Sequence, residues 1–334
     1  MTGDRMKIVC FGEALIDFLA QPGATPGAPR AFLQFAGGAP ANVAVAAARL
    51  GAQAQFVGML GADMFGDFLF DSLRDAGVDT TRIVRTDAAR TALAFVQLDA
   101  DGERHFSFYR PPAADLLFRD MHFDAVSFAE AAVFHVCSNS LVETDIARAT
   151  LEGMARARAA GAVVSLDLNL RPALWPGHAE PLPVLWTALM QADLVKLARN
   201  ELDYLAADMP GGEEAVLQRI LEGRASLVVV TDGAATLQWR TRQARGEVPA
   251  FRVRAVDTTA AGDAFVGGVL FSLAQRGVDG GRFAHFVSDS AAISEALRFG
   301  AAVGALAVTR QGAFAAMPTH AEVDALLKDS HDHA

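Results

Sequence analysis

Short, continuously apolar runs alternate with amphipathic stretches along this chain, and that alternation restricts its possible folds more than any other feature. Strands buried on both faces are apolar throughout, and they are joined by helices when they run parallel. The order therefore predicts an α/β fold with a mostly parallel central sheet covered by helices. The runs expected as strands are 131–138, 162–168, 194–197 and 227–231, and the expected helices are 144–160, 181–191, 262–275 and 287–308.

Two segments, 11–36 and 91–110, interrupt the alternation. In the second, apolar residues alternate on each side of Asp101-Gly102, a pair typical of hairpin turns. The first is strand-like but contains three prolines. We expect both segments to form a small antiparallel sheet that closes over a ligand as a lid, while the remainder of 1–334 forms the core of a single domain. An ordinary edge hairpin is the alternative.

Composition excludes several classes of protein. The 334 residues are 52% hydrophobic and 20% charged, which is enough apolar material for a sizeable core. Lys+Arg number 29 and Asp+Glu 39, so the net charge of −10 argues against a nucleic-acid partner. Neither cysteine lies in a metal-binding pattern. No apolar run approaches the ~20 residues of a membrane span, so we expect a cytoplasmic protein without a membrane partner.

The segment 256–268, VDTTAAGDAFVGG, is the most informative for chemistry. Ala260, Ala261 and Gly262 have small side chains at the predicted start of a helix, so their N–H groups can face an anion such as phosphate. Asp263 falls in the first turn, where a carboxylate can accept a proton from an attacking hydroxyl. The alternative is that Asp263 only stabilises the helix and the small residues only pack.

A second segment, 37–51, reads GGAPANVAVAAARLG. Gly37 and Gly38 allow close approach of the backbone to a small ligand, and Asn42 offers both a donor and an acceptor. Taken alone, paired glycines before a helix usually mark a turn. The chain contains neither the GxxxxGK[ST] loop nor a GxGxxG after its first strand, so P-loop and dinucleotide-binding enzymes are disfavoured.

Together these motifs resemble the ribokinase-like, or PfkB, carbohydrate kinases over about 7–328. Residues 257–263 match the family hallmark D-T-x-G/A-A-G-D, and GGAPANVA has the form typical of bacterial fructokinases. The resemblance implies a three-layer α/β/α ribokinase-like fold with a β-sheet lid. It also implies that Asp263 is the catalytic base and that the amides of 260–262 form an anion hole. Many members have glycine where this chain has Ala260, and alanine resists a positive φ.

The resemblance also assigns sugar-binding residues. Asp17, in FGEALIDF, corresponds to an acid that binds sugar hydroxyls, together with Gly37, Gly38 and Asn42. Arg110 matches a lid arginine that faces the substrate. Arg171, in DLNLR, is expected at the sugar and at the transferring phosphate. The alternatives are a surface acid for Asp17 and a simple ion pair for Arg171.

For ATP and cations, the resemblance implies two further sets of residues. Glu201 corresponds to the acid that organises hydrated Mg²⁺, although Ala198 replaces the family's asparagine. Asp257 and Thr259 correspond to residues that bind a monovalent cation such as K⁺ in some relatives. The residues expected at the nucleotide are Lys196, Thr231, Gly233, Gly262 and Ala302.

The sequence therefore predicts an ATP-dependent sugar kinase that converts fructose to fructose 6-phosphate. Both arginines would also suit the carboxylate of an acidic sugar, so 2-keto-3-deoxygluconate kinase is an alternative. A weakly catalytic sugar-binding regulator is another, supported by Ala198. We expect small-molecule partners, sugar and ATP, and a homodimer through the lid, with an apolar face near Phe106 and Phe108.

Overall fold

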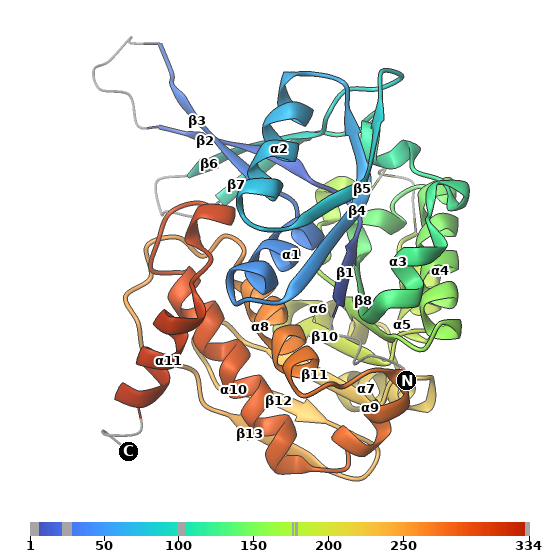
Figure 1. Cartoon of the computed structure of the whole chain (residues 1–334). Coiled ribbons are helices and arrows are strands. Elements are labelled where there is room, and N and C mark those ends of the chain that lie inside the picture. Colours follow the sequence, from blue (N-terminus) through green and yellow to red (C-terminus); the bar gives the residue numbers. More distant parts are fainter. Residues whose placement is uncertain (1–6, 22–28, 99–103, 176, 178–179, 331–334) are drawn as a thin grey trace.

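The computed structural model describes residues 7–21, 29–98, 104–175, 177 and 180–330, and these form two separate sheets (Figure 1). The larger sheet of this described part has nine strands in the order β13-β12-β11-β10-β9-β8-β1-β4-β5. Its pairs from β11 to β5 are parallel, and β12 and β13 add an antiparallel edge. The strands are β1 Lys7–Phe11, β4 Gln53–Gly61, β5 Asp79–Thr86, β8 Ala131–Cys137, β9 Val163–Asp167, β10 Leu194–Ala198, β11 Leu227–Thr231, β12 Leu237–Arg240 and β13 Arg245–Val248.

Helices cover both faces of this sheet, which confirms the expected three layers (Figure 1). Each face has its own apolar core, because the parallel strands are apolar on both sides. On one face pack α1 Ala39–Arg49, α2 Met64–Asp75, α8 Ala261–Gln275, α9 Gly280–Phe286, α10 Ser290–Ala307 and α11 His320–Asp329. On the other pack α3 Ala125–Glu130, α4 Thr144–Ala159, α5 Leu182–Leu189, α6 Arg199–Ala206 and α7 Gly212–Glu222.

The predicted helix over 287–308 is wrong at its start. The chain leaves α9 after Phe286 and begins α10 at Ser290. Asp289 ends the interruption because its carboxylate accepts hydrogen bonds from the N–H groups of Ala291 and Ala292, which caps the new helix.

The smaller sheet, which corresponds to the expected lid and is called the lid below, has the strand order β3-β2-β6-β7. The expected antiparallel arrangement is only partly right, because β2 and β6 pair in parallel while the two outer pairs are antiparallel. The predicted turn at Asp101-Gly102 lies outside the described residues. Phe11, at the edge of the expected lid segment, belongs to the large sheet. The strands are β2 Leu15–Ala20, β3 Phe32–Gly37, β6 Leu93–Leu98 and β7 Arg104–Tyr109.

Helix α8 lies between α1 and α10, and glycines allow this close packing. A Cβ on Gly267 would lie 2.5 Å from the Ala46 Cβ of α1. A Cβ on Gly268 would lie 2.7 Å from the Val303 Cγ2 of α10. Real Cβ atoms do not approach other atoms so closely, so glycine sets the distance between α8 and both neighbours.

We predict that Gly267→Ala separates α8 from α1 and destabilises the protein. Overpacking of a filled core costs about 1–3 kcal/mol, which urea unfolding will measure. The matched control is Gly281→Ala in α9, where the nearest atom to the new Cβ is 3.4 Å away, an ordinary contact. Equal stability of the two variants would contradict the packing argument.

Candidate active site

Asp263 lies in the first turn of α8, buried, with a partner on each carboxylate oxygen. Asn42 of α1 donates from Nδ2 to Oδ2 at 2.7 Å. Asn169, which follows β9, donates from Nδ2 to Oδ1 at 2.9 Å. Two amides from different parts of the fold therefore fix the orientation of the carboxylate. An oxygen that accepts one hydrogen bond keeps capacity for another, so the group can still receive a proton.

Asn169 belongs to the DLNLR stretch, and the sequence predicts no separate role for it. The structure holds it at a φ of +41°. Asparagine tolerates this left-handed conformation better than most residues. An asparagine just after a buried strand was thus the available signal, but the sequence did not show which carboxylate it would reach.

The environment raises the pKa of Asp263 from 3.8 to about 7. Burial is the largest cause, and the neighbouring Asp167 carboxylate adds to it. The hydrogen bond from Asn42 and the charges of Arg171 and Lys196 act in the opposite direction. A carboxylate whose pKa lies near neutral pH is suited to accept and later release a proton.

The start of α8 differs in detail from the expected anion hole over Ala260, Ala261 and Gly262. Ala260 caps the helix at a φ of +57°, the conformation that alanine was expected to resist. The Ala261 N–H already donates to the Thr258 carbonyl at 3.4 Å. The N–H groups of Gly262 and Asp263 lie in the first turn, where helix geometry supplies no acceptor. These two amides are the better anion donors.

Lys196 on β10 brings a buried positive charge to the same place. Its Nζ lies 3.0 Å from Asp167 Oδ1, and a Cβ on Gly262 would be 3.1 Å from it. Burial is the largest single effect on the pKa of Lys196 and lowers it, but the nearby carboxylates of Asp167, Glu201 and Asp263 together raise the pKa above its ordinary value. The ammonium group therefore stays charged beside the start of α8.

A cavity of about 610 Å³ opens from Asp263 along the ends of β9, β10 and β11. Such crevices at the carboxyl ends of parallel strands are the usual ligand sites of α/β folds. Residues singled out from the sequence that line it are Arg171, Lys196, Glu201, Thr231, Gly233, Ala260, Ala261, Gly262 and Asp263. Lining residues that sequence reasoning missed include Asn200, Phe251 and Arg252.

Ala302 is not part of this lining, so its expected place at the nucleotide is corrected. It is fully buried in the core, whereas Ala301, Gly304 and Ala305 of the same helix line the cavity. Successive residues of a helix point about 100° apart, so a shift of one residue moves a side chain from the cavity to the core.

Glu201, at the start of α6, uses both carboxylate oxygens to hold the backbone. Oε1 accepts from the Leu170 N–H at 2.8 Å, and Oε2 accepts from the Ala198 N–H at 2.7 Å. Burial raises the pKa of this carboxyl. Glu201 therefore ties the loop after β9 to the end of β10, where it lines the cavity.

The lid side of the site is shaped by the paired glycines. A Cβ on Gly37 would lie 2.2 Å from Asp17 Oδ2, so only glycine leaves room for this carboxylate. Gly38 has a φ of +105°, and its Cβ would lie 2.6 Å from the Glu13 carbonyl oxygen. The two glycines thus place the half-buried Asp17 beside the residues that lead into α1, the helix that carries Asn42.

Two further predicted residues are already bound to other parts of the protein. Arg110 is only 1% exposed and donates from Nε and Nη2 to Asp115 Oδ2, at 2.9 and 2.6 Å. Its guanidinium is therefore paired with Asp115 and is not free to meet a substrate directly, contrary to what the resemblance implies. Asp257 accepts from the Thr259 N–H at 2.8 Å and from the Gly312 N–H at 3.1 Å, which joins two loops.

The chain is similar to known proteins over nearly its whole length. Residues 5–320 match the pfkB family of carbohydrate kinases. The chain belongs to this family. Fructokinase-1 of Oryza sativa subsp. japonica is 42% identical over 331 residues, which is 99% of this chain and 100% of the relative.

Solved structures resemble this carbohydrate kinase over nearly its whole length. A fructokinase from Xylella fastidiosa with bound ATP is 60% identical, covers 98% of this chain and 99% of its own, and has a TM-score of 0.94. A fructokinase from Vibrio cholerae O395, bound to fructose, ADP and calcium ion, is 33% identical, covers 97% and 100%, and has a TM-score of 0.84.

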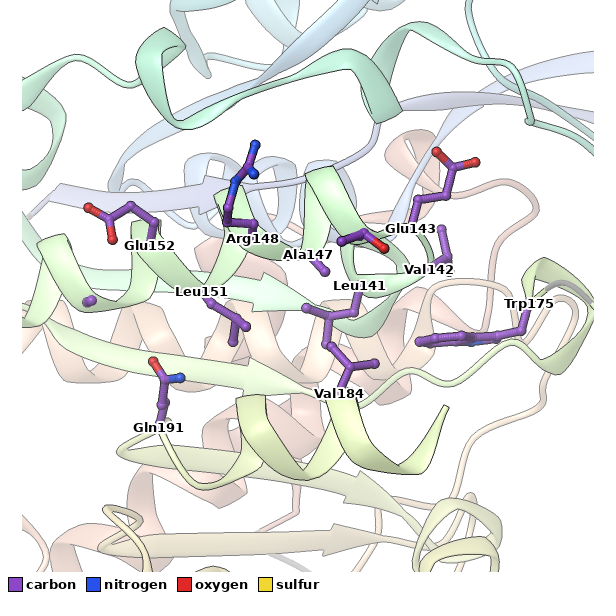
Figure 2. Close-up of a pocket in the computed structure, with 12 residues that line it drawn as sticks. Leu141, Val142, Glu143, Ala147, Arg148, Leu151, Glu152, Trp175, Val184 and Gln191 are labelled. Atoms are coloured by element: carbon purple, nitrogen blue, oxygen red, sulfur yellow. The ribbon is translucent and has the colours of Figure 1, made fainter. Parts of the chain in front are cut away.

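A second cavity of the kinase, about 680 Å³, lies between α4 and α5 (Figure 2). Figure 2 shows the Trp175 ring directed toward Leu141 and Val184 in its largely apolar lining. None of its lining residues also lines the cavity at Asp263. Among the residues that the structure describes, no helix is sufficiently long and apolar to span a membrane.

Proposed function

We propose that this carbohydrate kinase transfers the γ-phosphate of ATP to a primary hydroxyl of fructose, giving fructose 6-phosphate and ADP. The observation that carries the proposal is the buried Asp263 carboxylate, fixed by two amides at the mouth of the cavity. Relatives that cover nearly the whole chain are fructokinases, one solved with ATP and one with fructose and ADP. Fructose itself is therefore the substrate that best fits the comparisons.

In the proposed reaction, the sugar lies between Asp17 and Asp263, and ATP occupies the cavity. The hydroxyl oxygen forms a bond to the γ-phosphorus as the bond from that phosphorus to the bridging oxygen of ADP breaks. The hydroxyl proton passes to Asp263. Asn42 and Asn169 keep the accepting oxygens in place, which reduces the motion needed at the moment of transfer.

The transferring phosphoryl group carries negative charge, and three features of this chain oppose it. The first-turn amides of α8 and its dipole favour an anion. Lys196 adds a fixed charge next to Gly262. Arg171 lines the same cavity and is exposed enough to move toward a phosphate. Positioning and charge stabilisation are the main contributions of a protein to phosphoryl transfer.

We also propose that Mg²⁺ accompanies ATP. Mg²⁺ in kinases is typically held by substrate phosphates, water and one or two carboxylates. Glu201 fits this role because it lines the cavity and each of its carboxylate oxygens, which accepts one backbone hydrogen bond, can accept another. Glu201 would hold its water molecules, and the ion would neutralise phosphate charge. Omitting Mg²⁺ from the assay should abolish turnover.

For a monovalent cation, Asp257 and Thr259 are the proposed residues. A double mutant of the Vibrio cholerae enzyme was solved with fructose, ADP and potassium ion. In this chain the Asp257 carboxylate is buried and holds two loops close to the start of α8. Activation by K⁺ over Na⁺ at equal ionic strength is the expected result of titrating the two salts.

We further propose a cytoplasmic homodimer that associates through the lid. Tyr109 is 67% exposed on β7, and Phe32 and Leu33 of β3 are also exposed. Phe108 instead packs inward on the small apolar cluster at the base of the lid, and the Phe106 side chain lies outside the described part. A monomeric mass by light scattering at working concentration would contradict the dimer.

We predict that Asp263→Asn lowers kcat by about 10²–10⁴-fold, because the amide does not accept the proton. ATP binding, measured by calorimetry, should be retained because the cavity lining is otherwise unchanged. The matched control is Asp279→Asn, which removes the same charge from the exposed start of α9. Turnover close to wild type in Asp263→Asn would remove the base assignment.

We predict that kcat/KM rises with pH up to about 7 and is level above it. The reason is that the raised pKa of Asp263 leaves the carboxyl protonated, and so inactive as a base, at lower pH. Asp167→Asn removes a charge that raises this pKa, so the rising part of the pH profile of kcat/KM should move to lower pH. Lys196→Met removes a charge that lowers the pKa of Asp263, so the rising part of the pH profile should move to higher pH. A wild-type kcat/KM that rises near pH 4 and is level above it would be inconsistent with the buried base.

A further inference from the structure

Four buried polar side chains meet at the base of the lid, and we call them the lid-base cluster: Glu13, Arg110, Asp115 and Asn139. Asn139 donates from Nδ2 to Glu13 Oε1 at 2.9 Å. Asp115 binds two nitrogens of Arg110 through a single oxygen. Glu13 and Asp115 both act electrostatically on Arg110, which shows that the two pairs form one charged group.

The cluster lies where the chain passes between core and lid. Glu13 joins β1 to β2, and Arg110 directly follows β7. Glu13 Oε1 also accepts from the Ala39 N–H at 3.3 Å, next to Gly38. Ala39 is three residues before Asn42, about 4.5 Å along the helix axis. The cluster is therefore one helical turn away from the amide that holds Asp263.

Each member of the cluster has one buried polar atom without a hydrogen-bond partner. These atoms are Glu13 Oε2, Arg110 Nη1, Asp115 Oδ1 and Asn139 Oδ1. Buried polar atoms are normally paired, so this concentration indicates hydrogen-bonding capacity kept for water or substrate. The formal charge of the cluster is −1, from two carboxylates and one guanidinium.

The two ends of the site therefore differ in how accessible their cations are. On the nucleotide side, Lys196 and Arg171 face the cavity. On the sugar side, Arg110 is the buried cation of the cluster, and Asp115 already occupies it. Taking a substrate carboxylate to that end would place it among carboxylates without a free guanidinium, which carries a desolvation cost that no partner offsets.

We propose that Asp115 is a specificity-determining residue, which acts through Arg110 to make the kinase accept neutral sugars and reject sugar acids. The inference rests on the proposed sugar kinase activity and deepens it. Asp115 forms an ion pair with Arg110, so the guanidinium is not available to bind a substrate carboxylate. The paired guanidinium then serves to hold the lid base together, and the unpartnered atoms of the cluster remain for neutral hydroxyls.

The test compares kcat/KM for fructose and for 2-keto-3-deoxygluconate in the wild type and in Asp115→Asn. The variant removes the charge and keeps the size of the side chain, so Arg110 becomes able to bind a carboxylate. We expect the ratio of acid to fructose to rise about tenfold or more, the size of one charge-assisted hydrogen bond. Glu152→Gln on the exposed side of α4 is the control for net charge and should leave the ratio unchanged.

Glu13→Gln provides a second variant, because it removes a charge from the cluster and leaves the bond between Arg110 and Asp115 intact. It should raise the ratio less than Asp115→Asn does. A ratio that stays at the wild-type value in both folded variants overturns the proposal while the fructokinase activity stands.

Calorimetry of the wild type with each sugar tests the inference without any variant. The acid should bind at least about tenfold more weakly than fructose, and equal affinities would overturn the inference. This measurement applies even if the wild type turns over neither sugar, a result that would refute the proposed function alone.

Discussion

The close approach of α8 to α1 is the constraint on which the site depends. Gly267 leaves no side chain between the two helices, so Asn42 and Asp263 meet at 2.7 Å although they are 221 residues apart in sequence. The same approach brings the start of α8 over the ends of the central strands, where Lys196 and Asn169 lie. The start of α8, the carboxylate of Asp263 and the ammonium group of Lys196 therefore line the same cavity.

Burial disfavours the charged forms of both Asp263 and Lys196, yet only the pKa of Asp263 shifts in that direction. It raises the pKa of Asp263, which makes the carboxylate a stronger base, whereas Lys196 keeps its charge because carboxylates surround it. Asp167 contributes to both outcomes. One buried aspartate therefore adjusts a base and a cation together, and neither property can be assigned to its own residue alone.

Much of this arrangement was predictable from the sequence. Apolar runs predicted β8, β9, β10 and β11 of the large sheet, and the two small-residue motifs located Asn42 and Asp263, because both depend on local features of the chain. Contacts across the fold were not predictable in this way. The partner of Arg110 and the second amide on Asp263 follow from how loops meet in space. Ala302 was misplaced because a pattern identifies a helix more surely than the direction of one side chain.

The first turn of α1 has two attachments. Its Ala39 N–H is held by Glu13 at the base of the lid, and its Asn42 holds Asp263. The backbone that orients the buried carboxylate is therefore the same backbone that fastens the small sheet to the core, so one short turn serves both parts of the fold.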